Sequence, residues 1–177
     1  MKIGNAFLFL MEKENMLKNK AYKFRIYPNE KQKELIEKTF GCTRFVFNWC
    51  LEKSITKYKE EKITLRYKDY ASMLVEMKKE YEFLKEVDSI SLQQSLRHLD
   101  MAFTNFFKEK ETRFPKFKSK KNDKSYTTVT VNNNIKIEDK YIILPKLGKV
   151  KFKKHRLINK EEIIKSVVVS RVSNKYY

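Results

Sequence analysis

A short segment near the start of the chain has the pattern of a β-strand but no strand close to it in sequence. Residues 21–27 place three apolar side chains on one face and two cations on the other: Tyr22, Phe24 and Ile26, then Lys23 and Arg25. The next alternating segment begins only at residue 126. Because an isolated strand is unstable in water, the sequence predicts that residues 21–27 join a sheet built from the later strands.

The residues between these strands have the three- and four-residue spacing of amphipathic helices. Periodic stretches begin near residues 29, 67 and 88. Asn29 is suited to cap the first stretch, and Gly41 can divide it in two. We therefore expect three or four helices that pack together as an insertion between the first and second strands.

The chain changes character after Lys110. Residues 113–125 form a cationic stretch interleaved with Phe114 and Phe117, and Pro115 excludes a helix interior there. Beyond it, segments of period two are separated by turn residues and cover 126–131, 135–137, 141–144, 150–152 and 166–172. This pattern predicts an antiparallel sheet or small barrel, and with the helices it gives an α+β fold.

The expected layout has five parts. They are an N-terminal extension (residues 1–18), the first strand of a β-barrel (19–28), an inserted helical domain (29–112), a basic arm (113–125) and the remainder of the barrel (126–177). The extension resembles nothing downstream, and Met16 would serve as an alternative start.

The charge balance favours a polyanionic partner. The 177 residues carry 40 Lys and Arg against 22 Asp and Glu, which gives a net charge of +18. Such a charge repels itself unless nucleic acid or another polyanion neutralises it. A generally lysine-rich composition without functional meaning is the alternative, and the positions of the cations along the chain distinguish the two.

Cysteine usage and hydropathy point to a cytoplasmic protein without a membrane partner. Cys42 and Cys50 have neither a second pair nor a nearby histidine, so we expect reduced core residues, not a zinc site or a disulfide framework. The apolar run at residues 6–11 is too short for a membrane span and poorly shaped as a signal peptide.

Six sequence blocks occur in order along residues 20–172, and together they resemble the TnpB (OrfB) transposon-associated family. They read KAYKFRIYP (20–28), TFGCTRFVFN (39–48), SLQQSL (91–96), FPKFK (114–118), NNNI (132–135) and LPKLG (144–148). Each block alone is a weak signal, whereas the ordered series is specific. The resemblance implies a wedge-type β-barrel with an inserted, helix-turn-helix-like recognition domain, followed in the family by a RuvC-like nuclease and a zinc ribbon.

The resemblance also implies that this chain stops before the nuclease domain, so we expect no catalytic residue, metal site or cofactor in it. Cleavage by two metal ions needs several converging carboxylates. Asp88 lies where a helix cap is expected and Asp100 on a polar helix face, so both favour structural roles. His98 and His155 have no partner at metal-ligand or general-base spacing.

In the family, this half of the protein reads a short motif in duplex DNA and holds the scaffold of a guide RNA. Tyr67, Gln93 and Asn132 match the family's motif-reading residues, and a glutamine suits the major-groove edge of adenine. Other positions depart from the family's types, which leaves the preferred motif open: Ser89, Ile90 and Val131. Without the resemblance, Gln93 and its neighbour Gln94 would be interpreted as a solvated helix face.

Cations in the basic arm are spaced to follow a phosphate backbone. We expect phosphate or RNA contacts from Arg113, Lys116, Lys118, Lys120, Lys121 and Lys124, with Lys23 and Arg25 as weaker candidates. Phe114 and Phe117 can stack on bases or anchor the arm to the core, and anchoring is the favoured role.

The leading hypothesis is the nucleic-acid-binding N-terminal portion of a TnpB-like protein, without a nuclease centre of its own. Two alternatives are the front fragment of an RNA-guided DNA endonuclease and a nuclease-less DNA-binding repressor. A ribosomal or RNA-chaperone protein would explain the charge but not the ordered blocks.

Overall fold

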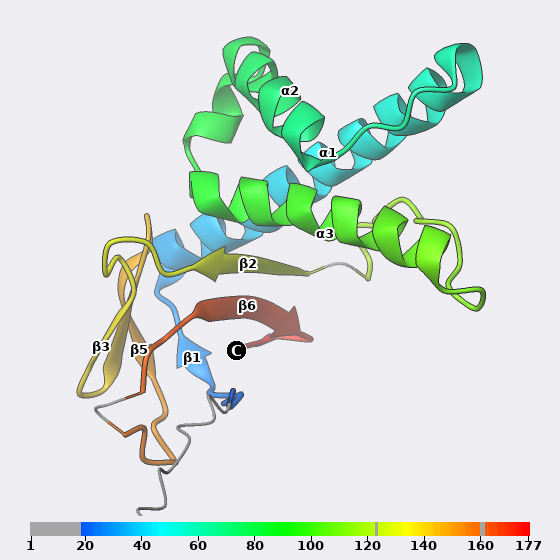
Figure 1. The fold of residues 1–177 in the computed structure, drawn as a ribbon. Helices are drawn as coiled ribbons and strands as arrows, with labels where there is room; N and C mark the ends of the chain where they lie inside the picture. Colours follow the sequence, from blue (N-terminus) through cyan, green and yellow to red (C-terminus); the bar gives the residue numbers. More distant parts are fainter. Residues whose placement is uncertain (1–18, 123, 160–161) are drawn as a thin grey trace, which may run out of the picture.

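A computed structural model describes residues 19–122, 124–159 and 162–177, so the expected extension at 1–18 lies outside the described residues. Figure 1 shows the helices grouped on one side of a curved sheet. They are α1 (Glu30–Glu61), α2 (Tyr67–Glu80), the short 3-10 helix η1 (Glu82–Lys85) and α3 (Ser89–Lys108). The α+β class is confirmed.

The first helix is continuous, so the expectation of a break at Gly41 is wrong. Asn29 caps α1: its side chain accepts from the backbone N–H of Gln32 at 2.8 Å, while the Gln32 side chain accepts from the Asn29 N–H at 3.0 Å. Phe40 and Cys42, on either side of Gly41, are both buried. Their packing outweighs the ~1 kcal/mol that glycine costs inside a helix.

Seven strands form one antiparallel sheet in the order β2-β6-β7-β1-β5-β4-β3. Their bounds are β1 (Ile26–Tyr27), β2 (Ser125–Val129), β3 (Lys136–Glu138), β4 (Tyr141–Leu144), β5 (Gly148–Phe152), β6 (Ser166–Val172) and β7 (Lys175–Tyr176). Ile26 pairs with Phe152 on one side and with Tyr176 on the other, so the first strand joins the later ones.

The first strand is shorter than the sequence pattern predicts. Only residues 26–27 are in β1, although the Arg25 carbonyl still accepts from the Lys153 N–H at 2.8 Å. Earlier in the segment, side chains make the contacts instead, because the Tyr22 hydroxyl donates to Glu162 at 3.0 Å. Alternation of apolar residues therefore identified the buried face but not the length of strand pairing.

The expected closure of the sheet into a barrel is not confirmed. Strands β2 and β3 lie at the two edges, and within the described residues no strand pairing joins them. The sheet is therefore open.

Two apolar clusters share α1. The first turns of this helix contribute Ile36 and Phe40 to a cluster with the inner face of the sheet, including Ile26 and Val150. The remainder of α1 packs with α2 and α3 around buried residues such as Tyr70. No helix within the described ranges is long and apolar enough to cross a membrane.

The third helix is joined to the edge of the sheet through Asp88, the residue directly before it. Asp88 caps α3 by accepting from the N–H groups of Ile90 at 3.1 Å and Ser91 at 3.2 Å. The same carboxylate accepts from the Thr128 hydroxyl of β2 at 2.7 Å. This confirms the expected capping role of Asp88, and it also fixes where α3 begins relative to β2.

Candidate nucleic-acid interface

Two of the expected motif-reading residues, Tyr67 and Gln93, lie on the neighbouring helices α2 and α3. The Arg97 guanidinium lies over the Tyr67 ring, 4.1 Å from its centroid. Gln93 is exposed and precedes Arg97 by one helical turn, so both project from the same side of α3. Sequence reasoning missed Arg97, although its four-residue spacing from Gln93 was a usable signal. We call Tyr67, Gln93 and Arg97 the reading face.

The reading face is held in place by Asp100, which is the structural role expected for it. This carboxylate accepts from the Tyr67 backbone N–H at 3.2 Å and pairs with the Arg66 Nε at 3.1 Å. The Arg66 side chain also donates to the Thr104 hydroxyl at 3.1 Å. The start of α2 is therefore tied to α3 directly beside Tyr67 and Arg97.

The third expected reader, Asn132, lies outside the helices. It is exposed in the turn after β2, and it has a positive φ of 50°, as an asparagine can adopt. The turn is closed by a 2.8 Å hydrogen bond from the Val131 N–H to the Asn134 side chain. Because Thr128 of β2 is bonded to Asp88, the N-cap of α3, this turn leaves the sheet toward the end of α3 that carries Gln93.

The basic arm (residues 113–125) is fixed to α1 at its middle; its last residue belongs to β2. The Asn48 side chain donates to the Lys118 carbonyl at 2.9 Å and accepts from the Lys118 N–H at 2.8 Å. The Lys118 ammonium lies 4.4 Å from the centroid of the Phe47 ring. The arm is therefore a packed strip of chain, not a loose linker.

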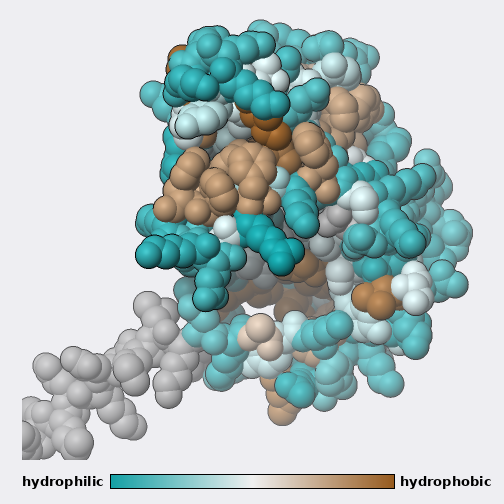
Figure 2. Space-filling model, turned by 90° about the vertical axis from the view of Figure 1, so that its right-hand side faces the viewer, coloured by the Kyte–Doolittle hydropathy of each residue, from teal (hydrophilic) through white to brown (hydrophobic). Residues whose placement is uncertain are grey.

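Phe114 anchors the start of the arm, as expected. Its ring contacts those of Phe103 and Phe106 edge-on, at centroid distances of 5.6 and 5.3 Å. Figure 2 shows apolar surface surrounded by hydrophilic side chains on the side of the molecule where α3 ends and the arm begins.

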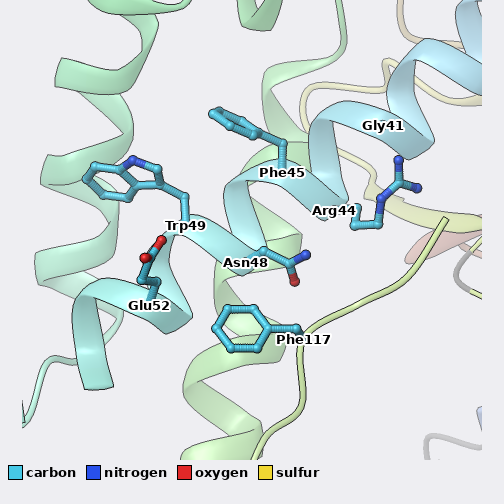
Figure 3. Close-up of a pocket in the computed structure, with 7 residues that line it drawn as sticks. All are labelled: Gly41, Arg44, Phe45, Asn48, Trp49, Glu52 and Phe117. Atoms are coloured by element: carbon cyan, nitrogen blue, oxygen red, sulfur yellow. The ribbon is translucent and has the colours of Figure 1, made fainter. Parts of the chain in front are cut away.

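Phe117 has a different position from Phe114. It is 57% exposed and forms one wall of a 470 Å³ groove along α1. Figure 3 shows the other lining residues, all from α1: Gly41, Arg44, Phe45, Asn48, Trp49 and Glu52. The groove lies where Asn48 binds the arm, so Phe117 is available for contact with a ligand as well as with α1.

The remaining candidate cations lie in two different parts of the structure. In the arm, Arg113, Lys116, Lys120 and Lys121 are exposed and Lys124 is half-buried, and none of them forms an ion pair with another described residue. Lys23 and Arg25 instead lie beside the sheet, where their charges face the Tyr177 ring at 4.4 Å and the Tyr27 ring at 5.4 Å. The structure therefore divides the predicted phosphate contacts between the arm and the sheet.

Thiol, imidazole and carboxylate groups do not gather in the described part of the chain, where no group of three or more could hold a metal ion. Cys42 and Cys50 are free and buried, and burial raises the pKa of their thiols to about 11 and about 12. Burial and the charge of Lys118 lower the pKa of His98. The His155 ring contacts Phe24 at 5.1 Å between centroids.

A family model for a helix-turn-helix domain of the OrfB type matches residues 16–62. Within the described part of that range, the chain forms β1 and the single helix α1. The match therefore covers the region that joins the sheet to the helices, whereas the reading face comes from α2 and α3.

Three curated proteins are similar to this chain. It is 40% identical over 113 residues to a putative RNA-guided DNA endonuclease of Streptomyces pristinaespiralis, covering 63% of this chain and 28% of that protein. It is 32% identical over 166 residues to the putative RNA-guided DNA endonuclease InsQ of Escherichia coli K12, covering 92% of this chain and 40% of that protein. It is 39% identical over 111 residues to virulence protein VsdF of Salmonella dublin, covering 57% of this chain and 93% of that protein. The chain thus spans less than half the length of both endonuclease relatives.

Proposed function

Because this chain belongs to the TnpB (OrfB) transposon-associated family, we propose that it recognises a short motif in duplex DNA through its reading face. The observation that carries the proposal is the contact between Arg97 and Tyr67 on the exposed side of α3, one turn from Gln93. Glutamine can bond both major-groove groups of adenine, and arginine both acceptors of guanine. These two side chains are therefore suited to read neighbouring base pairs.

The cations of the basic arm would position the duplex without reading it. Phosphate contacts fix the orientation of a protein on DNA, while contacts to base edges provide sequence preference. The arm follows α3 in the chain and is bound to α1 by Asn48, so its charges keep a fixed relation to the reading face. Fixed cations lose less conformational entropy on binding than cations on a flexible tail.

We also propose that the chain contacts the scaffold of a guide RNA and does not itself cut DNA. RNA binding is supported by the names of the two endonuclease relatives and by the cations beside the sheet. The roles of the acids support binding without cleavage, because Asp88 caps α3 and Asp100 ties Arg66 to it. Cleavage of DNA by the purified chain with a divalent metal and co-purified RNA would overturn this part.

Selection from a randomised duplex library tests the reading function. We expect the full chain to enrich a short motif, and Gln93→Ala or Arg97→Ala to weaken binding to it by about 5- to 100-fold, as for loss of a bidentate base contact. Gln94→Ala provides the matched control on the neighbouring side of α3 and should leave affinity unchanged. Absence of an enriched motif, or full affinity in both reading-face variants, would reject the proposal.

A second candidate function is a DNA-binding repressor or competitor that works without a nuclease. The observation that favours it is the coverage of VsdF, because the region similar to this chain makes up 93% of that protein. A short protein of this type would occupy the DNA motif and block other proteins. A reporter gene carrying the selected motif in its promoter should be repressed by the chain, and Gln93→Ala should relieve the repression.

A further inference from the structure

The outer face of the sheet carries exposed tyrosines in register with a lysine. Tyr27 of β1 lies opposite Lys151 of β5, and Lys151 lies opposite Tyr141 of β4. Directly opposed residues share one face of a sheet, so the three form a row across neighbouring strands. Tyr27 is 46% exposed and Tyr141 is 42% exposed, which leaves much of both rings open to solvent.

Cations surround this row, while apolar residues occupy the opposite face. Strand alternation places Arg25 beside Tyr27 on the outer side, and the guanidinium lies 5.4 Å from the Tyr27 ring centroid. Ile26 and Val150, on the inner side, are buried in the sheet cluster. The sheet therefore buries its apolar face and presents an aromatic and cationic face to solvent.

A hollow of 590 Å³ borders this outer face at Tyr27 and Lys151. Its lining consists of Tyr27, Asp139, Lys140, Lys151, Phe152, Lys153 and Lys154. The nearby Glu138 is already paired with Lys149 at 2.8 Å, which leaves Asp139 as the acid of the hollow. Among the described residues, none of the four lining lysines forms an ion pair. The hollow therefore attracts anions.

We propose that this surface, the tyrosine–lysine face (Tyr27, Tyr141, Lys140, Lys151, Lys153 and Lys154), binds an unpaired nucleic-acid strand. Bases would stack on Tyr27 and Tyr141, and the lysines would bind the phosphates between them. The two tyrosines are two strands apart, which is about 10 Å at ordinary strand spacing. Exposed aromatic rings on a sheet can take bases of any type when these are splayed out, but they cannot stack on bases held inside a duplex.

This inference extends the proposed function to a second surface but does not depend on duplex recognition by the reading face. Arg25 and Lys23 support it from the side, since their charges already lie against Tyr27 and Tyr177. RNA and single-stranded DNA share the relevant chemistry, namely free base faces and a phosphate chain. The experiment therefore compares both.

Fluorescence anisotropy of the full chain with labelled oligouridine, oligothymidine and a short duplex tests the proposal. We expect Tyr27→Ala and Tyr141→Ala each to weaken binding of the unpaired strands by about 5- to 100-fold, the range for loss of one stacked base. Tyr27→Phe and Tyr141→Phe should bind almost as well as the native chain. Stronger binding of oligouridine would identify RNA as the ligand, and equal binding would show that either strand is accepted; both outcomes support the proposal.

Tyr58→Ala is the matched control, because Tyr58 is 52% exposed on α1 and also lies near a lysine, Lys62. It should leave affinity for unpaired strands unchanged. Gln93→Ala should do the same, while Tyr27→Ala should keep binding to the selected duplex motif, so the two proposals fail separately. Native affinity for unpaired strands in both alanine variants would overturn the inference, as would an equal loss of duplex binding.

Photocrosslinking of the native chain to 5-bromouridine RNA gives a test that does not depend on variants folding. Crosslinks mapped by mass spectrometry to Tyr27 or Tyr141 would support the stacking contacts. Crosslinks confined to the helices and the basic arm would overturn them.

Discussion

Cys42 and Cys50 show how strongly the buried face of α1 is shielded from water. Both thiols are buried, and burial raises their pKa to about 11 and about 12, so both remain protonated at neutral pH. Since the thiolate is the reactive form, neither cysteine is suited to redox chemistry in the folded protein.

Thiol labelling checks this directly. At neutral pH we expect Ellman's reagent to modify neither cysteine of the native chain, and both of them after unfolding in urea. The unfolded sample also serves as the control for reagent activity. Rapid labelling of a native thiol would show that α1 is less tightly packed than described.

The substitution Gly41→Ala tests how much stability the low helix propensity of glycine costs in α1. A Cβ added there would meet no atom within 4 Å, so Gly41→Ala should raise the free energy of unfolding by about 0.5–1 kcal/mol, measured by urea denaturation. Gly148→Ala is the contrasting variant, because Gly148 has a φ of +67° and a side chain is strained in that conformation. It should destabilise the chain by about 1 kcal/mol; destabilisation by both substitutions would contradict the reasoning.

At the scale of secondary structure elements, the junction between α3 and β2 determines the position of the reading face relative to the sheet. Asp88 ends the loop before α3, caps the helix and accepts a hydrogen bond from Thr128. The capping role follows from the sequence, because an aspartate directly before an apolar helical stripe is a local pattern. The bond to Thr128 depends on tertiary structure and could not be predicted in that way.

Asp88→Ala should lower the free energy of unfolding by about 1–3 kcal/mol, since it removes a cap and leaves the buried Thr128 hydroxyl without this acceptor. Thermal unfolding of the variant would measure the effect. Thr128→Val should cost less, because the cap remains. Asp69→Ala provides a comparison at an exposed cap, where Asp69 accepts from the Arg66 N–H, and we expect a loss of about 0.5–1 kcal/mol there.

At the scale of the whole molecule, the cations proposed to contact nucleic acid lie on two separate surfaces, the basic arm and the outer face of the sheet. If about six cations contact phosphates of a duplex, the logarithm of affinity should fall with the logarithm of salt concentration at a slope of about −5. The slope counts phosphate contacts whatever the sequence of the DNA.

Replacing three arm lysines with alanine, Lys116, Lys120 and Lys121, should reduce the magnitude of this slope by about 3, measured by anisotropy across a salt series. The matched control replaces Lys57, Lys79 and Lys85, each of which is already paired with a glutamate on the helices. An equal change in both triple variants would mean that total charge, and not the arm, determines binding.

The α+β class and several strands could be predicted from sequence because they depend on local patterns. The ranges 141–144 and 166–172 match β4 and β6. Closure of the sheet could not be predicted, since it depends on whether two distant edges pair. The same limit applies to the site: the family resemblance selected Tyr67 and Gln93, but the position of Arg97 over Tyr67 exists only after α2 has packed on α3.

The place of β1 in the centre of the sheet has a consequence for synthesis on the ribosome. Ile26 has one neighbour in β5 and the other at Tyr176, so β1 cannot complete its pairing until Tyr176 has been translated. The helical insert has its own apolar cluster and can assemble while translation continues. During that interval Ile36 and Phe40 lack the strands that cover them, so we expect these apolar side chains to stay exposed on the nascent chain until the later strands pair.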